Sequence, residues 1–207
     1  MKQLLLLAGL CVTSLLVAQT AAPFDYYLLS LSWAPEFCAQ PGEAAANPLE
    51  CGQGKGFVVH GLWPEANQGK SPESCGAAKT VPKSLVNDML KYIPSASLIQ
   101  HEWATHGTCT GLSQGDYFTK VMVARAAVQI PVQISSLGQS TTESPAEIEA
   151  QFAAANPSFP QGAVRTACSG ADLTEVRVCF DKNLKALACT ASAGECASAG
   201  VTIRSPR

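Results

Sequence analysis

Several features that would place a protein in a specialised class are missing from this sequence of 207 residues. Basic residues are few: 14 Lys and Arg stand against 16 Asp and Glu, for a formal net charge of −2. A charge this close to zero excludes a protein that holds nucleic acid over a broad basic surface. There is no internal repeat, heptad pattern or block of like charges, and a hydrophobic content of 47% is too high for a disordered chain. The sequence therefore predicts one folded domain with a substantial core.

Only one apolar run is long, and it lies at the start of the chain. Lys2, an apolar run of 14 residues from Leu4 to Val17, and the small residues that follow are the three parts of a secretory signal. A run of this length is too short to span a membrane, which takes about 20 residues. We expect residues 1–22 to be a signal peptide cleaved between Ala18 and Ala22. Residues 23–207 should then form a secreted or periplasmic domain without a membrane anchor.

Cysteine, in contrast, is abundant for an exported chain of this size. Loss of the signal peptide removes Lys2 and Cys11, which changes the net charge from −2 to −3 and leaves eight of nine Cys. An even number of Cys in an oxidising compartment indicates four disulfides rather than buried free thiols. No CxxC pair occurs, so a cysteine metal site is the weaker interpretation. The residues alone leave the pairing of the eight Cys open.

The hydrophobic pattern predicts strands early in the chain, helices in the middle and further strands at the end. Residues 24–33 (FDYYLLSLSW) and 56–63 (GFVVHGLW) are typical of buried strands. Segments with helical spacing or a capping residue are expected to be helices: 82–93, 98–106, 114–128 and 145–155. The segments EVRVCF (175–180) and ALACT (186–190) are expected to be short antiparallel strands. Because strands and helices do not alternate regularly, the order favours the α+β class.

Histidine is scarce, and its distribution is uneven. The three His lie in two short segments, FVVHGLWPE (57–65) and HEWATHGTC (101–109). Histidine transfers protons near neutral pH, so two of them can serve as base and acid. If HEWATH is helical, Glu102 and His106 lie on one face, where the carboxylate can orient the imidazole. The clustering therefore predicts a catalytic site; the alternative is that all three His are packed and hydrogen-bonded without a catalytic role.

The spacing also tests two other kinds of catalytic site. A zinc-binding HExxH motif places its two His four residues apart on one face. His101 and His106 are five apart, about 140° round a helix at 100° per residue. A zinc hydrolase with His60 as a third ligand stays a weaker alternative, because zinc geometry is demanding. A Ser or Cys nucleophile has little support, since no GxSxG occurs and the Cys are expected to pair.

The two histidine segments resemble the active-site segments of the T2 ribonuclease family, which are exported endoribonucleases. The segment YYLLSLSWAPEFC (26–38) is similar to the N-terminal segment of that family. The resemblance implies a single α+β domain, with a central antiparallel β-sheet flanked by helices and stapled by disulfides. The pairs that it implies are Cys38–Cys51, Cys75–Cys109, Cys168–Cys196 and Cys179–Cys189. The second pair would fix the two histidine segments relative to each other.

The resemblance also assigns roles to four residues. His60 corresponds to the general acid, His106 to the general base and His101 to the histidine that contacts the phosphate. Glu102 corresponds to the carboxylate that supports the transition state. The reaction implied is cleavage of single-stranded RNA without metal or cofactor. The base takes the proton of the ribose 2′-OH, and the acid protonates the departing 5′-oxygen. A 2′,3′-cyclic phosphate forms and is hydrolysed to a 3′-phosphate; DNA lacks the 2′-OH and should be untouched. We expect a monomer.

Base binding should use aromatic faces, on which unpaired bases stack. Trp63 and Glu65 are the first candidates for one base site, and Tyr117 and Phe118 are weaker candidates for a second. For each aromatic ring, packing in the core is the alternative. Trp33 and Trp103 are expected to be core residues.

One position departs from the family pattern. The family usually has a Lys directly before its last His, and this chain has Thr105. A Lys there would stabilise the charge of the phosphorane, whereas Thr donates only a neutral hydrogen bond. Another cation, such as Lys55 or Lys120, could substitute for it. The alternative is a catalytically weakened RNA-binding or cell-surface protein of the same fold.

Overall fold

The structure, a computed structural model, describes residues 21–190, 193–194 and 196–206. Residues 1–20 of the predicted signal peptide lie outside this range. Among the described residues, no helix is long and apolar enough to cross a membrane.

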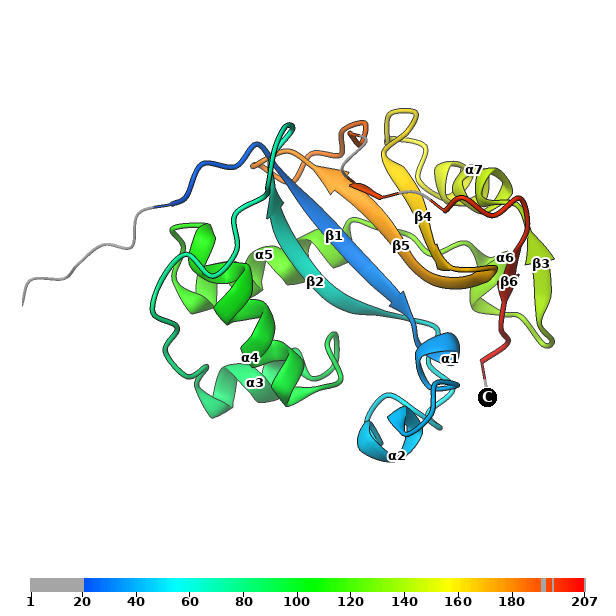
Figure 1. Cartoon of the computed structure of the whole chain (residues 1–207), viewed down its shortest axis with the longest axis horizontal. Helices are drawn as coiled ribbons and strands as arrows, with labels where there is room; N and C mark the ends of the chain where they lie inside the picture. Colours follow the sequence, from blue (N-terminus) through cyan, green and yellow to red (C-terminus); the bar gives the residue numbers. More distant parts are fainter. Residues whose placement is uncertain (1–20, 191–192, 195, 207) are drawn as a thin grey trace, which may run out of the picture.

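A twisted sheet of six strands runs through the centre of the molecule (Figure 1). Strand β1 (Tyr26–Trp33) lies between β2 (Phe57–Glu65) and β5 (Asp172–Phe180) and is antiparallel to both. Strand β4 (Val164–Ser169) pairs antiparallel with β5. Strand β6 (Val201–Ile203) meets β5 at a single parallel bridge and pairs antiparallel with β3 (Thr141–Glu143). The predicted antiparallel sheet is therefore correct except at this bridge, which makes the sheet mixed.

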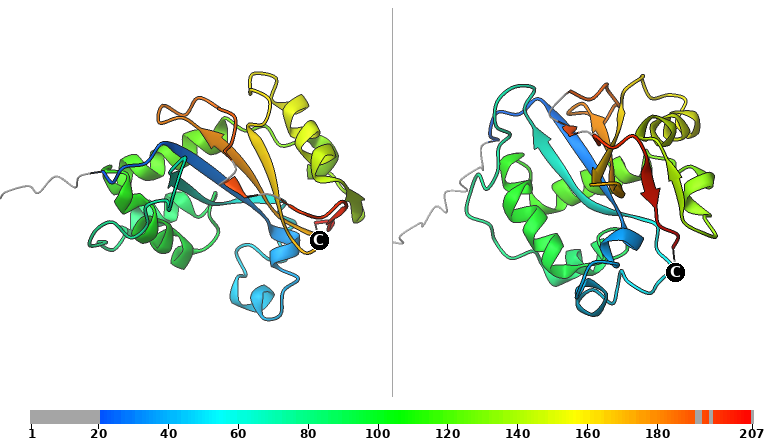
Figure 2. Two further views of the ribbon diagram at one scale, coloured as in Figure 1. Left: turned by 45° about the horizontal axis from the view of Figure 1, so that its top comes forward. Right: turned by 45° about the vertical axis from the view of Figure 1, so that its right-hand side comes forward.

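The longer helices lie in two groups against the sheet, as the views of Figures 1 and 2 show. The first group is α3 (Lys83–Met89), α4 (Ala96–Thr105) and α5 (Gln114–Ala126), of which α4 and α5 contact β2. The helix α7 (Pro145–Ala155) contacts β4 at the other side. Short helical turns complete the fold: α1 (Ala34–Phe37), α2 (Glu43–Ala46), α6 (Val132–Ser135) and the 3₁₀ turn η1 (Gly107–Cys109). This arrangement is the predicted single α+β domain.

The centre of the sheet is buried on both faces, as the apolar run of β1 predicts. Seven of the eight β1 residues are buried, Ser32 being the exception. Trp33 and Trp103 belong to the core as expected, at 0% and 4% exposed. Ser30 and Ser32 put small side chains on one face of β1, opposite Leu29 and Leu31.

The predictions fail mainly where strands are short. Residues 186–190 do not form the expected strand: Ala186 makes an isolated bridge to Phe180, the Leu187 amide donates to the Cys179 carbonyl, and Cys189 is joined to Cys179 by a disulfide. The strands β3, β4 and β6 were not expected, since six or fewer residues carry too little pattern. The predicted helices are present, with ends shifted by a few residues, and α7 has the expected capping box of Ser144 and Glu147.

Four disulfides staple the domain, and their pairing is the one that the resemblance implies. They are Cys38–Cys51, Cys75–Cys109, Cys168–Cys196 and Cys179–Cys189. The second closes a loop of 34 residues between the segment after β2 and the turn after α4. A disulfide of this kind removes conformational freedom mainly from the unfolded chain.

Candidate active site

A β-bulge in β2 positions His60. The pairing with β1 shifts between Ser30, opposite Gly61, and Leu31, opposite Val59, so His60 is the extra residue. Bulges bend a strand and re-aim a side chain, and they are frequent beside active sites. The His60 side chain is 33% exposed and lines two adjoining cavities of about 340 and 230 Å³.

The end of α4 supplies the second histidine segment. Ser95 caps the start of this helix by accepting a hydrogen bond from the Leu98 amide at 3.3 Å. Glu102 points inward and is 1% exposed, whereas His101 is exposed. His106 caps the end of the helix with φ −111° and ψ −46°. Its φ departs from the ideal helical value, and the rings of His106 and His101 have centroids 6.4 Å apart.

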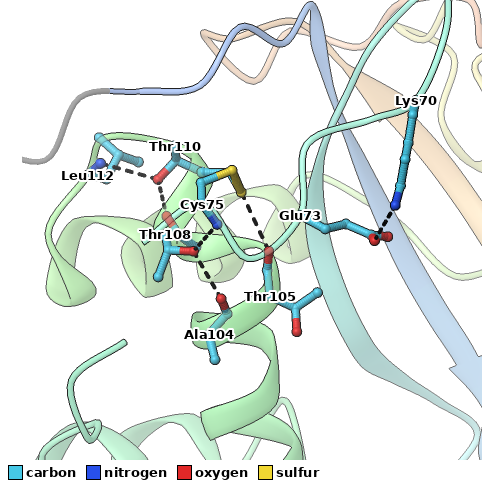
Figure 3. Close-up of a disulfide and its surroundings, with 10 residues drawn as sticks. Lys70, Glu73, Cys75, Ala104, Thr105, Thr108, Thr110 and Leu112 are labelled. Atoms are coloured by element: carbon cyan, nitrogen blue, oxygen red, sulfur yellow. Dashed lines mark hydrogen bonds and ion pairs between the residues drawn. A yellow bond between two sulfur atoms is a disulfide. The ribbon is translucent and has the colours of Figure 1, made fainter. Parts of the chain in front are cut away.

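The Cys75–Cys109 disulfide holds the loop after β2 against this helix end (Figure 3). The Cys75 amide donates to Thr108 Oγ1 at 3.2 Å, and the same hydroxyl donates to the Ala104 carbonyl at 2.9 Å. The Ser74 amide adds a hydrogen bond to the Thr105 carbonyl at 2.7 Å. The disulfide thus links the two histidine segments as the resemblance implies.

Glu102 and Trp63 connect the two histidine segments. The indole Nε1 of Trp63 donates to Glu102 Oε2 at 2.9 Å, and the Trp63 ring stacks on His106 with centroids 5.3 Å apart. Glu102 Oε1 is buried, accepts no hydrogen bond among the described residues and lies 3.8 Å from His60 Nε2. A Cβ at Gly61 would overlap both Glu102 and Trp63. The glycine after His60 is therefore required for this contact.

Two residues of the site were not predicted from the sequence, and both come from β5. Glu175 Oε1 lies 2.7 Å from His60 Nδ1. Arg177 donates to Glu175 Oε2 from Nε at 2.9 Å, and its guanidinium lies 5.5 Å from the centre of the Trp63 ring. The signal that could have found them is an acidic and a basic residue two apart in a predicted strand, which places both on one face.

The cations suggested as substitutes for the missing family Lys do not reach the site. The Lys120 ammonium donates to the Lys182 carbonyl at 3.0 Å and lies over Tyr27. Lys55 lines cavities to which His60 does not contribute. Thr105 itself places its hydroxyl 3.5 Å from His101 Nδ1. Arg177 is the cation that lies beside the cluster.

The surroundings shift the pKa values of the two partly buried histidines, His60 and His106, in opposite directions. Burial lowers the pKa of His60, but the hydrogen bond to Glu175 and the negative charges of Glu102 and Glu175 outweigh it, so that this pKa is raised. Burial lowers the pKa of His106 to about 4, and repulsion by His101 and His60 acts in the same direction.

The two carboxylates of the cluster also differ. Burial raises the pKa of Glu102 to about 7, although His60 and the Trp63 hydrogen bond oppose this. Burial would raise the pKa of Glu175 as well, but the hydrogen bond to His60 and the charge of Arg177 lower it to about 2. Glu175 is therefore ionised at any ordinary pH.

The predicted second base site is wrong. Tyr117 and Phe118 are both 0% exposed, and the Tyr117 hydroxyl donates to the Leu62 carbonyl at 3.1 Å. Their rings fill the core between α5 and β2, so no base can stack on them. The first candidates remain accessible in part: Trp63 borders the histidines, and Glu65 accepts a hydrogen bond from the Ser71 hydroxyl. Burial raises the pKa of Glu65.

The cluster also contains a possible metal-binding group. Ligand atoms of His101, Glu102 and His106 all lie within 4.8 Å of one another. The irregular helix end brings these residues together despite the unfavourable five-residue spacing.

The fold and the site define a class of protein: a disulfide-stapled α+β domain that gathers two histidines and a buried carboxylate around a tryptophan. The family described as Ribonuclease T2 matches residues 24–193. The chain therefore belongs to the ribonuclease T2 family.

Curated relatives agree with this assignment. A "Ribonuclease" of Aeromonas hydrophila is 34% identical over 151 residues, which cover 70% of this chain and 67% of that protein. A "Probable ribonuclease" of Haemophilus influenzae is 32% identical over 181 residues, covering 81% of this chain and 62% of that protein. The matches thus span about two thirds of the length of these two relatives.

Solved structures share the fold. The RNase-related protein from Calystegia sepium superposes with a TM-score of 0.71 at 23% identity, covering 89% of this chain and 98% of that one. RNase NT, solved in complex with 5′-AMP, superposes with a TM-score of 0.62 at 20% identity, covering 89% of this chain and 98% of that one.

Proposed function

We propose that this protein is an exported endoribonuclease that cleaves single-stranded RNA by transesterification and needs no metal ion. The observation that carries the proposal is that His60 and His106 both border Trp63, whose indole is hydrogen-bonded to the buried Glu102 carboxylate; their pKa values are shifted in opposite directions. The pKa of His106 is lowered to about 4, so this histidine is neutral and can accept a proton near neutral pH. Burial lowers the pKa of His60, but the hydrogen bond to Glu175 and the charges of Glu102 and Glu175 raise it overall, which favours the protonated form that can donate. Two titratable groups pushed apart in this way mark the base and the acid of a reaction.

Each histidine then performs one proton transfer. His106 takes the proton of a ribose 2′-OH, and the resulting oxygen attacks the adjacent phosphorus. The bond from phosphorus to the 5′-oxygen breaks, and His60 gives its proton to that oxygen. The products are a 2′,3′-cyclic phosphate and a free 5′-hydroxyl. Hydrolysis of the cyclic phosphate uses the same groups in reverse and leaves a 3′-phosphate.

The neighbouring residues support the charge that develops on the phosphorane. Exposed His101 lies next to His106 and can contact a phosphate oxygen. Glu102, with its pKa raised to about 7, is partly protonated near neutral pH. Oε1 of Glu102 is buried 3.8 Å from His60 Nε2 and has no hydrogen-bond partner among the described residues, so it can donate a hydrogen bond when it is protonated. Such a donor stabilises developing negative charge where water is excluded.

RNA is the substrate class that this chemistry requires. The nucleophile is the 2′-OH, which DNA lacks. The family and the names of the relatives point to RNA, and the structural neighbour RNase NT was solved with a nucleotide, 5′-AMP. A base adjoining the scissile bond would lie against Trp63 and Glu65, which follow His60 on β2. We take the active species to be a monomer.

Export is part of the proposal. Residues 1–22 have the composition of a signal peptide, which would leave residues 23–207 as the catalytic domain. Four disulfides suit an oxidising compartment, either outside the cell or in the periplasm. One relative, from Solanum lycopersicum, carries the name "Extracellular ribonuclease LE".

Product analysis on a mixed-sequence RNA in the presence of EDTA tests the function. The expected products end in 2′,3′-cyclic phosphate and then 3′-phosphate, and a DNA of the same sequence stays intact. If RNA is bound but no cyclic phosphate forms, the chain is a weakened RNA-binding member of the family, the outcome that Thr105 in place of Lys leaves open.

A zinc hydrolase is the second candidate, favoured by the grouping of His101, Glu102 and His106. The same RNA cleavage assay, with EDTA and then with added zinc, tests this candidate. Activity that EDTA abolishes and added zinc restores would favour it, whereas full cleavage in EDTA contradicts it.

A further inference from the structure

Glu175 and Arg177 of β5 form a buried ion pair, and Glu175 contacts the His60 ring. Glu175 is 9% exposed, and a buried carboxylate is costly unless it is paired and hydrogen-bonded. Both of its oxygens are engaged: Oε1 lies 2.7 Å from His60 Nδ1, and Oε2 accepts from Arg177. The Arg177 guanidinium contacts Oε2 through a second nitrogen at 2.7 Å.

The sheet explains how residues so distant in sequence meet. Ser32 of β1 pairs with Glu175 on one side and with Val58 on the other, and Ser30 pairs with Arg177 and with Gly61. These two serines are small, so the long side chains of β5 can reach across β1 to the side chain of His60. A larger residue at either serine would lie between the side chains of β5 and β2 on this face.

Arg177 is itself anchored. Its third guanidinium nitrogen, Nη1, donates to the Ala193 carbonyl at 2.9 Å, and the guanidinium group lies over the Trp63 ring. These contacts fix the position of the guanidinium, and its hydrogen bonds to Glu175 in turn fix the position of that carboxylate. The result is a connected chain of contacts from Arg177 through Glu175 to His60.

We propose that Glu175 is a positioning residue for the reaction, held by Arg177, that fixes the orientation and tautomer of His60. This inference rests on the proposed function. Glu175 accepts the hydrogen bond from Nδ1–H, which leaves Nε2 facing Glu102 and the site. The proton that leaves His60 is then the one on Nε2. It moves to the departing 5′-oxygen, and the imidazole stays neutral with its proton on Nδ1.

The pH behaviour of His60 depends on every charged group that faces it. Glu175 and Arg177 come from β5, and Glu102 and His106 come from α4 and its end. Glu50, in the loop after α2, also interacts with His60. Burial and the charge of Arg177 disfavour the protonated form of the imidazole, whereas the hydrogen bond to Glu175 and the charges of Glu102 and Glu175 favour it.

The variant Glu175→Gln keeps the shape of the side chain and removes its charge. We expect kcat for a dinucleoside phosphate to fall on the order of 10²-fold, with KM little changed, because acid catalysis is worth about 10² to 10⁴. The alkaline limb of the kcat profile should move to lower pH, since His60 loses its proton more readily. The matched control is Glu149→Gln, which breaks the Glu149–Arg165 ion pair far from the histidines and should change neither. An unchanged kcat and alkaline limb in Glu175→Gln would overturn the proposal.

A measurement on the unaltered protein separates this inference from the proposed function. Nitrogen NMR of the histidine rings shows which nitrogen of neutral His60 carries the proton. We expect Nδ1–H; an Nε2–H tautomer would overturn the positioning role even if RNA is cleaved. Absence of RNA cleavage by the unaltered protein would instead overturn the proposed function, and the ring spectra would still decide where Glu175 holds the proton.

Discussion

His60 and His106 are chemically identical side chains that border the same tryptophan, yet their settings are opposite. His60 lies on a strand and contacts two carboxylates, which raise its pKa. His106 lies at the end of a helix among other histidines, and its pKa is lowered to about 4. The negative end of the α4 dipole would favour a cation at His106, but burial and repulsion are stronger. The comparison teaches that the environment, rather than the residue type, divides the roles of acid and base.

The two regions also differ in how the chain builds them. The His106 segment is local: the ten residues of α4 and His106 at its end supply the helix, both His and Glu102. The His60 region is assembled from three strands, with its main partner 115 residues away in sequence. A local motif can be recognised in the sequence, whereas a partner across the sheet requires the fold.

The largest effect should come from removing either histidine. His60→Ala and His106→Ala should each lower the rate of cyclic phosphate formation by about 10² to 10⁴, since each removes one proton transfer. Circular dichroism checks that both variants fold. A wild-type rate in His106→Ala would show that the assignment of the base is wrong.

Gly61→Ala tests the contact that joins the two regions. The added Cβ would overlap Glu102 and Trp63, and nothing lies within 4 Å of a Cβ at Gly138, which makes Gly138→Ala the control. We expect Gly61→Ala to lower kcat roughly 10²-fold, as a shift of about 1 Å can, and to cost about 1–3 kcal/mol of unfolding free energy. Urea denaturation measures the unfolding free energy, and initial rates of RNA cleavage measure kcat. If Gly61→Ala and Gly138→Ala had the same kcat and the same unfolding free energy, the Trp63–Glu102 contact would be dispensable.

His101→Ala should weaken the enzyme without inactivating it. The ring is exposed, so its loss should cost on the order of 10-fold, below the 10² typical of a preorganised donor. Steady-state rates on RNA, compared with those of His106→Ala, measure the difference. A loss as large as that of His106→Ala would give His101 an acid–base role and remove the contrast between the exposed and buried histidines.

Thr105→Lys should have the smallest effect, with an unchanged or raised rate. A Lys restores the family pattern beside His101, and a charge-assisted hydrogen bond is about twice as strong as a neutral one. The rate of cleavage at several salt concentrations shows whether the new charge acts on the phosphate. A large loss would mean that the site is built around the Thr105 hydroxyl.

The sequence predicted the parts of the fold and site that are local. The two long strands, the main helices and the three His with Glu102 all follow from contiguous patterns. Glu175 and Arg177 were missed because pairing across β1 is set by the sheet register. Tyr117 and Phe118 were misjudged as base-site residues, although they share α5 with the core residues Val121 and Ala124, a spacing that marks a buried helix face. Residues 186–190 were misjudged because they make only an isolated bridge to β5, beside the Cys179–Cys189 disulfide, instead of a continuous strand.

The comparison of the two histidines is tested most directly by NMR titration of their rings in the unaltered protein. We predict that His106 titrates near pH 4, far below the ordinary histidine pKa of about 6.5, and that His60 titrates above that value. The rate of RNA cleavage should then rise as pH passes the lower value, because the base must be neutral, and fall as it passes the higher one, because the acid must be protonated. If His106 instead titrated at or above the pKa of His60, the assignment of base and acid would be contradicted.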